Sequence, residues 1–376
     1  MALTRVHIPP DILRWAVQRA GKDVDEYASE HPKYREWLEG VSDPTFSMAQ
    51  KFAQKLYVPF GYLFLKEPPK EKLAIPFFRR NQIGSQNLNI SDTVNEMVYR
   101  QDWLSDYLKN NNFDKLPFVG KYKDVNSPVL LSNAIHDELG LPVNWALDFH
   151  TVNDAINHLV QIMEDKGIVV TFNSMVGNNT RRPLSVKECR GFCLVDDYAP
   201  FIFINSKDAK GAQMFTLMHE FAHILLGYSS GVGDHEALKN ASALERLCDT
   251  TAALALVPED LFAEEWAKAP YGYDILAKRF KVSRYVVARR ACEAGYITRN
   301  RMFQLFHEWD EEPMPQKKAG QVDFNVMAIR RNSRTFLIHL CNALDGHQIL
   351  HSDAYRMVGL KPDTFDKVLT SKAFLK

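Results

Sequence analysis

The sequence is poor in cysteine, and this limits the kinds of protein it can encode. Its five cysteines are scattered over 376 residues, and no two of them form a Cys-x-x-Cys pair. An odd number without close spacing is not typical of a disulfide framework, and it fits a reducing compartment better. We therefore expect a cytoplasmic protein without structural disulfides.

The sequence also lacks a net charge and a long apolar run. Its 46 Lys and Arg residues balance 46 Asp and Glu residues, so the whole chain gives no electrostatic reason to expect nucleic acid or an anionic membrane as a partner. No apolar stretch approaches the roughly 20 residues needed to cross a bilayer. The N-terminal segment has no basic stretch followed by an apolar core, so we predict no secretory signal.

What is present is enough apolar side chain, 46% of the residues, to build two or three cores. Four regions differ in pattern. They are a helical domain at 1–68, a proline-rich linker and connecting helix at 69–130, a mixed domain at 131–309, and a small helical tail at 321–376. Within the mixed domain, strands are predicted at 168–172, 191–197 and 201–205 because these stretches are rich in β-branched and aromatic residues. The expected fold class is α+β, mostly helical, with a small sheet.

The clearest chemical signal is a His-Glu-x-x-His motif in the stretch MFTLMHEFAHILLG, residues 214–227. Positions i and i+4 share one face of a helix, so His219 and His223 can reach the same ion, with Glu220 beside them. Catalytic zinc takes three protein ligands and a water, and a nearby carboxylate can accept the proton of that water. The alternative is a core helix with two satisfied histidines. Because the helix is apolar on nearly every side, its polar groups need buried partners, and we predict a Zn²⁺ site with Glu220 as general base.

A third ligand is expected from a later helix, predicted at about 236–257. The metzincin spacing is absent, because Ser229 stands where its third histidine would be. Glu245 lies on an otherwise apolar helix face, where a carboxylate is costly unless a cation meets it. We predict Glu245 as the third ligand and Asp249, one turn on, as acceptor for a ligating histidine. A surface ion pair of Glu245 is the alternative, and Asp234, His235 and Glu236 are competing ligands in a glycine-rich loop.

The stretch FIFINSKDAKGAQMFTLMHEFAHILLG, followed by ERLCDTTAALALVP, resembles the ImmA/IrrE metallo-endopeptidases. Matching positions include Asn205, the 219–223 motif, Glu245 and Pro258. Asp249 departs from the family pattern, which usually has Asn there, and Leu247-Cys248 replaces Glu-Ala. The resemblance implies a zincin-like peptidase domain that uses zinc, with Glu220 as general base and a protein as substrate.

The resemblance extends to the N-terminal region. IPPDILRWAVQRAGKDVDEYA and DPTFSMAQKFAQKLYVPFGYLFL are similar to the lambda-repressor-like helix-turn-helix segment that often precedes this peptidase. The domain order is that of bacterial or phage regulators, in which some members cleave a partner repressor and others are encoded beside toxin or mobile-element genes. Residues 1–68 hold nine basic and nine acidic side chains, which is a poor footprint for phosphate contacts. DNA binding and a partner-docking role both stay open.

A second helix-turn-helix-like segment lies at 276–298, LAKRFKVSRYVVARRACEAGYIT. It reads as helix, Val-Ser turn and helix, and six basic side chains face a single Glu between 278 and 293. These candidates for nucleic-acid binding are Lys278, Arg279, Lys281, Arg284, Arg289 and Arg290. The competing interpretation is a helical face that packs on the peptidase domain.

Substrate handling is predicted from position alone. The strand at 201–205 is expected to be a sheet edge on which an extended substrate pairs, with Asn205 and Tyr228 as candidates for contacting the substrate or its oxyanion. The substrate itself is left open between a repressor and a co-encoded toxin-type protein. A different function also stays open: a non-proteolytic, antitoxin-like regulator that binds DNA or a partner and keeps a structural or vestigial zinc site, which four protein ligands would indicate.

Overall fold

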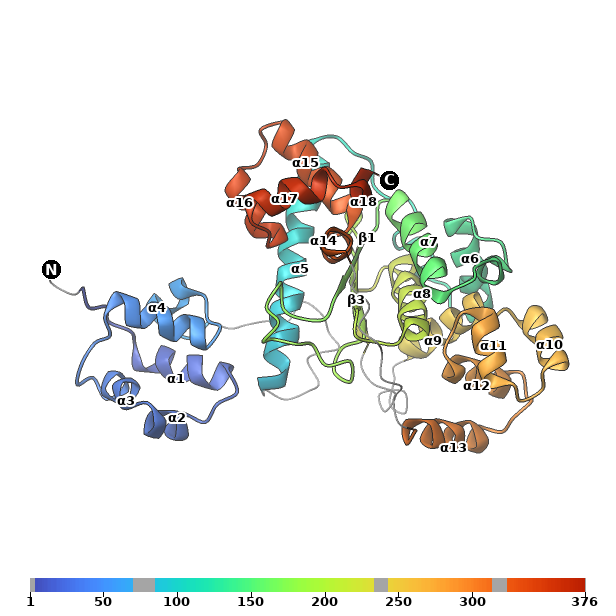
Figure 1. Ribbon diagram of the computed structural model, residues 1–376, viewed down its shortest axis with the longest axis horizontal. Coiled ribbons are helices and arrows are strands. Elements are labelled where there is room, and N and C mark those ends of the chain that lie inside the picture. Colours follow the sequence, from blue (N-terminus) through green and yellow to red (C-terminus); the bar gives the residue numbers. More distant parts are fainter. Residues whose placement is uncertain (1–3, 70–84, 233–242, 313–322, 376) are drawn as a thin grey trace. The chain divides into compact units, whose positions relative to one another are not determined.

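A computed structural model describes residues 4–69, 85–232, 243–312 and 323–375 of the chain (Figure 1). Contacts divide the chain into two compact units. The first takes in the N-terminal helices and the start of helix α5 (Ser85–Asn110) as far as Asn95, and the second takes in the described residues from Glu96 onward. The predicted proline-rich linker at the start of 69–130 lies mostly outside the described residues.

The first unit is helical, as the apolar periodicity predicts. It consists of α1 (Pro10–Arg19), α2 (Val24–Glu30), α3 (Pro32–Leu38), α4 (Phe46–Lys55) and the 3-10 helix η1 (Phe60–Phe64). Asp23 caps α2 by accepting from two backbone N–H groups, and Thr45 caps α4 by accepting from one, that of Met48. Their apolar faces meet in one core around Leu13, Tyr34 and Phe52. The lambda-repressor-like identity of this unit stays a prediction.

The second unit is built on a four-stranded sheet with the order β1-β3-β2-β4. Its strands are β1 (Val169–Asn173), β2 (Gly191–Leu194), β3 (Phe201–Asn205) and β4 (Ser230–Val232). β1 runs parallel to β3, whereas β2 is antiparallel to both β3 and β4. The three predicted strands are confirmed. The prediction that 201–205 forms a sheet edge is wrong, because β3 is hydrogen-bonded on both sides, and β4 was not predicted.

Helices cover both faces of this sheet (Figure 1). On one face lie α7 (Val152–Asp165) and α8 (Lys210–Leu226), backed by α6 (Pro128–Leu139) and α9 (Ala243–Leu256). Alternate strand residues such as Val170, Cys193 and Ile202 share an apolar cluster with α8 on this side. The opposite face is covered by α5, α14 (Phe324–Asn332) and α15 (Arg334–Asp345), and Phe336 of α15 packs edge-on against Phe201.

The C-terminal helices are therefore tied to the sheet. Glu164, near the end of α7, accepts hydrogen bonds from the hydroxyl of Ser333 and from the N–H of Arg334 (2.9 Å), and so caps the start of α15. Burial raises the pKa of Glu164 to about 7, although both hydrogen bonds oppose this rise. The predicted helical character of 321–376 is confirmed for the described residues.

The remaining described elements are all helical, which confirms a mostly helical α+β fold. They are the 3-10 helix η3 (Trp145–Asp148), α10 (Glu259–Lys268), α11 (Tyr273–Phe280), α12 (Arg284–Glu293), α13 (Arg299–Asp310), α16 (His351–Val358), α17 (Pro362–Leu369) and α18 (Lys372–Leu375). Among the described residues, none of these helices is long and apolar enough to cross a membrane.

Candidate metal centre

Helix α8, which carries the His-Glu-x-x-His motif, is fixed at both ends. At its start, the side-chain amide of Gln213 donates to the carbonyls of Ser206 and Asp208, at 3.1 and 2.8 Å. At its end, Gly227 takes a left-handed conformation (φ +79°), which glycine adopts without steric cost. The N–H groups of Gly120 and Tyr122 then donate to the last carbonyls of the helix, at 3.0 and 2.9 Å. The side chains of the motif therefore project from a rigid element.

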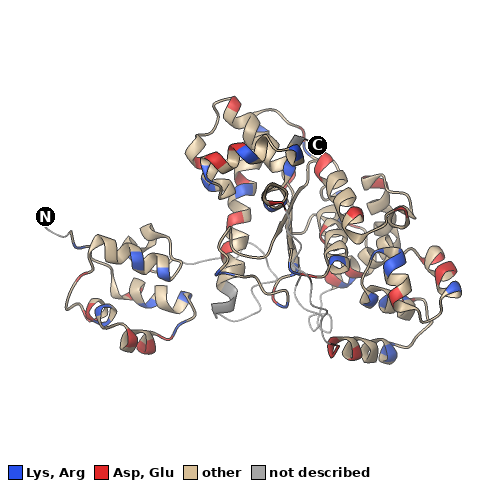
Figure 2. Ribbon diagram, in the orientation of Figure 1, with Lys and Arg blue, Asp and Glu red and all other residues tan. Residues whose placement is uncertain are grey.

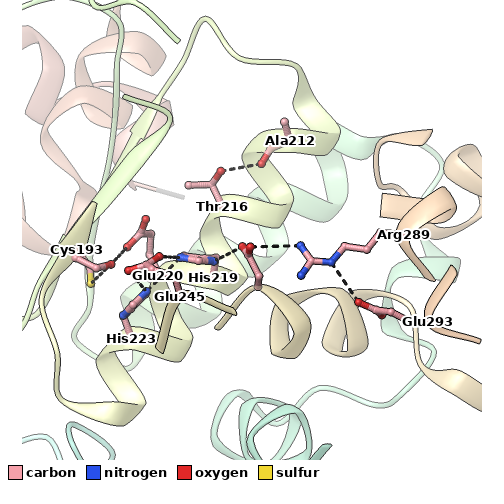
Figure 3. A network of polar contacts seen from close by, with 11 residues as sticks. Cys193, Ala212, Thr216, His219, Glu220, His223, Glu245, Arg289 and Glu293 are labelled. Atoms are coloured by element: carbon pink, nitrogen blue, oxygen red, sulfur yellow. Dashed lines mark hydrogen bonds and ion pairs between the residues drawn. The ribbon is translucent and has the colours of Figure 1, made fainter. Parts of the chain in front are cut away.

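The two histidines and Glu245 converge in the interior between α8 and α9 (Figure 3). The Nε2 atoms of His219 and His223 lie 3.1 Å apart. The carboxylate oxygens of Glu245 lie 3.4 Å from His219 Nε2 and 3.6 Å from His223 Nε2. Both histidines are essentially inaccessible, at 1% and 0% exposure, and the Glu245 side chain is 18% exposed.

These distances fit a single metal ion. For bonds of 2.0–2.1 Å at tetrahedral angles, ligand atoms lie about 3.3 Å from one another. The two Nε2 atoms are 3.1 Å apart, and each lies 3.4–3.6 Å from a Glu245 oxygen, Oε2 for His219 and Oε1 for His223, which is close to that value. The donor set of two imidazoles and one carboxylate is one that catalytic zinc sites use. The ligand atoms all lie within 4.8 Å of one another, and this is the one such group in the ranges that the structure describes. The competing residues Asp234, His235 and Glu236 lie outside those ranges.

Asp249 lies behind His219, as the helical spacing predicts. Its Oδ1 is 3.0 Å from His219 Nδ1, and its Oδ2 is 3.3 Å from a guanidinium nitrogen of Arg289. Burial disfavours a charge on His219, but Asp249 and Glu245 outweigh burial and raise the pKa of its ring to about 10. Burial would also raise the pKa of Asp249, yet its contacts with His219 and Arg289 lower it below the ordinary value. Asp249 therefore carries a negative charge beside the candidate ligand.

In the described part of the chain, one carboxylate oxygen of Glu220 is hydrogen-bonded and the other is not. Its Oε2 accepts a hydrogen bond of 3.1 Å from the hydroxyl of Ser230 on β4, whereas its buried Oε1 has no hydrogen-bond partner among the described residues. The thiol of Cys193 lies 3.9 Å from the same hydroxyl. Burial raises the pKa of Glu220 to about 7, while the nearby His219 opposes the rise and Glu245 adds to it.

The sequence did not point to Ser230. It lies in a stretch read as a glycine-rich loop, and a three-residue strand carries too little pattern to be recognised. Only the sheet order places it beside Glu220, because β4 pairs with β2 over the motif helix.

The two predicted substrate contacts have different outcomes. Asn205 is fully buried, and its amide donates to the carbonyl of Cys189 (2.9 Å) and accepts from the N–H of Lys207 (3.1 Å). It therefore holds the end of β3 and offers nothing to a substrate, which corrects the prediction. Tyr228 directly follows the C-terminal glycine of α8 and is 50% exposed. Its side chain remains available for contact with a substrate.

The basic segment is confirmed as two helices, α11 and α12, with Ser283 capping the second. Its turn is packed against α8. A Cβ atom added to Gly211 would lie 2.6 Å from backbone atoms of Val282 and Ser283, so this glycine permits a very close approach. The residues at 286–288 and 290–291 of α12 are buried. The second helix therefore packs against the rest of its unit, which favours packing on the peptidase domain over nucleic-acid binding, the two interpretations that the sequence leaves open.

Most of the basic side chains in this segment form hydrogen bonds or ion pairs with other groups of the protein. In Figure 2, basic positions of α11 and α12 lie among acidic positions of neighbouring helices. Arg290 is buried and donates to the carbonyl of Val257 (2.9 Å), and Arg284 pairs with Glu312 (2.6 Å). The buried ammonium of Lys281 donates to backbone carbonyls of its own turn, and Arg279 pairs with Glu265 at 3.5 Å. Lys278 is exposed.

Comparison with known families agrees with the site. A peptidase family model described as IrrE N-terminal-like domain matches residues 163–291, which run from the end of α7 through the sheet, α8 and α9 into α12. The match supports the ImmA/IrrE resemblance and a metallopeptidase-type function for this region. It includes most of the basic helix pair. A second model, a domain of unknown function (DUF8813), matches residues 332–371. No curated protein matches the chain.

Proposed function

We propose that this protein is a zinc-dependent metallo-endopeptidase that acts in the cytoplasm on a specific protein partner, such as a transcriptional regulator or a protein of a toxin or mobile-element module. The observation that carries the proposal is the convergence of His219, His223 and Glu245, with a second carboxylate, Glu220, beside them. Three protein ligands are the number that leaves a coordination position open for water. The cysteines are all unpaired, in keeping with a reducing compartment.

The chain's own residues divide the work as follows. His219, His223 and Glu245 would hold the ion, and Asp249 fixes the ring of His219. When bound, zinc would lower the pKa of a water molecule and polarise the scissile carbonyl. Glu220 accepts the proton of the attacking water at its free Oε1, because Ser230 holds its other oxygen. The same carboxyl group later delivers the proton to the leaving amine.

Substrate binding is proposed for the β4 edge of the sheet. Among the described strands, β4 is paired only with β2, so its other side can accept an extended peptide. Ser230 lies on this strand and bonds Glu220, so a peptide paired there would lie close to the general base. Tyr228, two residues earlier and half exposed, would donate to the carbonyl oxygen that becomes negatively charged.

The test is to incubate the wild-type protein and Glu220→Gln with the product of the neighbouring gene and to compare the fragments. The wild type should cleave, and the variant should be slower by about 10²–10⁴-fold while keeping its zinc. His219→Ala should lose the zinc. Cleavage by Glu220→Gln at the wild-type rate would refute the mechanism. Absence of cleavage, together with a shift of the protein's own promoter DNA, would favour the non-proteolytic regulator.

A further inference from the structure

Arg289 connects the basic helix α12 to the candidate metal centre. Its Nη1 lies 3.3 Å from Asp249 Oδ2, and its Nε donates to Glu293 Oε1 at 3.2 Å. The other oxygen of Asp249 lies 3.0 Å from His219 Nδ1. A continuous chain of charged groups thus crosses three helices, from α8 through α9 to α12 (Figure 3).

Asp249 depends on both of its contacts. Its side chain is only 8% exposed, so water cannot fully replace a lost partner. A buried carboxylate oxygen without a partner costs a few kcal/mol. If Arg289 were removed, the Asp249 carboxylate would be better solvated if it turned toward water, and it would then no longer contact His219. The contact between Arg289 and Asp249 Oδ2 therefore fixes the orientation in which Oδ1 meets the imidazole.

The other arginine side chains of α12 contact groups other than Asp249. The guanidinium of Arg290 is directed to the carbonyl of Val257 and to Glu293, and that of Arg284 to Glu312 and the face of Trp309. The guanidinium of Arg289 also donates to Glu293, and this contact limits its conformations independently of Asp249. The position of Arg289 is thus specified by contacts on both sides.

We propose that Arg289 is a positioning residue of the metal centre: by holding Asp249 it fixes the ring of His219 and strengthens metal binding. This inference rests on the proposed function only in taking His219 as a ligand. It also gives the basic segment a role that is directed inward. The competing interpretation is an ion pair that merely joins α9 to α12.

The experiment measures zinc affinity of the full-length chain, stripped of metal and titrated with Zn²⁺ against a competing chelator. Arg289→Met should weaken binding, by at most the about 10–100-fold that is usual for losing the residue directly behind a ligand, here Asp249. Arg284→Met, which removes an ion pair from the same helix without touching Asp249, is the matched control and should bind zinc like the wild type. Thermal unfolding of the metal-free proteins checks that each variant is folded.

A double-mutant cycle separates positioning from simple joining. If Arg289 acts through Asp249, then Asp249→Asn should itself weaken zinc binding, and adding Arg289→Met should weaken it no further. Equal zinc affinity of wild type and Arg289→Met would overturn the inference and leave the proposed function intact. The same loss from Arg289→Met in both backgrounds would also overturn it. A wild-type protein that binds no zinc would overturn both.

Discussion

Replacing Gly211 by alanine should disturb the contact between the start of α8 and the turn that joins α11 to α12. The new Cβ would lie 2.6 Å from the carbonyl carbon of Val282 and the nitrogen of Ser283, and 3.0 Å from the Val282 carbonyl oxygen. Ordinary carbon contacts are about 3.5–4.0 Å, so these atoms must separate by roughly 1 Å. They are backbone atoms and cannot rotate away, so one of the two elements has to shift.

The magnitude follows from two opposing effects. Overpacking of this kind costs about 1–3 kcal/mol, whereas exchanging glycine for alanine inside a helix returns at most about 1 kcal/mol. Gly211 is the second residue of α8, where that gain is smaller because the helix has just begun. We expect a net loss of about 1–2 kcal/mol. In a unit of about 280 residues, this corresponds to a fall in melting temperature of roughly 2–4 °C.

The assay is thermal unfolding of the metal-free protein followed by circular dichroism. Gly61→Ala is the control, because a Cβ at Gly61 meets no atom within 4 Å, and its melting temperature should change little. Zinc affinity of Gly211→Ala should fall as well, because a displaced α12 carries Arg289 away from Asp249. A Gly211→Ala protein as stable as the wild type would mean that the turn does not pack on α8. The segment at 276–298 would then again be a candidate for nucleic-acid binding.

Three further outcomes are expected. Ser230→Ala should slow cleavage by about 10-fold, because one hydrogen bond to the Glu220 carboxylate is lost, and its zinc content should not change. Ser230→Thr keeps the hydroxyl and should restore the rate. An alanine variant with the wild-type rate would exclude the positioning of Glu220 by this hydroxyl. Zinc at 100 times its Kd should raise the free energy of unfolding by about 2.7 kcal/mol. In a thermal-shift titration, His219→Ala should abolish this rise. An equal rise in the variant would mean that the ion binds elsewhere. Because the pKa of Glu164 is raised to about 7, its contribution to stability is full below its unfolded pKa and is lost as the pH rises through about 7. The stability of Glu164→Gln relative to the wild type should therefore rise between about pH 5 and about pH 8, by on the order of 3 kcal/mol in the free energy of urea unfolding. A stability difference that does not change with pH would contradict the raised pKa of Glu164.

The residues that meet in the candidate centre could be found from the sequence because their geometry is local. The spacing of four residues places two imidazoles on one face of a helix whatever the rest of the fold does. Glu245 could be proposed because a carboxylate on an apolar helix face needs a cation. Asp249 followed from the next helical turn. In each case one helix, read alone, determined which side chains share a face.

The features that the sequence did not reveal depend on how distant segments pair. The stretch FIFIN reads equally well as an edge or a central strand, because a strand buried on both faces shows no alternation. Its central place in the order β1-β3-β2-β4 is set by the crossover from β1 and by the hairpin to β2. Asn205 appeared free for a substrate for the same reason. The carbonyls that accept from its side-chain amide belong to Leu184 and Cys189, in a loop whose path cannot be predicted from local sequence.

The charge of segment 278–293 cannot be interpreted from that segment alone. The count of +5 is correct, but the acidic partners come from elsewhere in the chain: Asp249 from α9, Glu265 from α10, and Glu312 from the residues after α13. A phosphate that recruited Arg289 would have to break its pair with a buried carboxylate, which costs about 3–5 kcal/mol when one partner is left alone. The same change would release Asp249 from its orientation toward His219. Nucleic-acid binding through this face of α12 would therefore act against metal binding, so the two functions compete for one side chain.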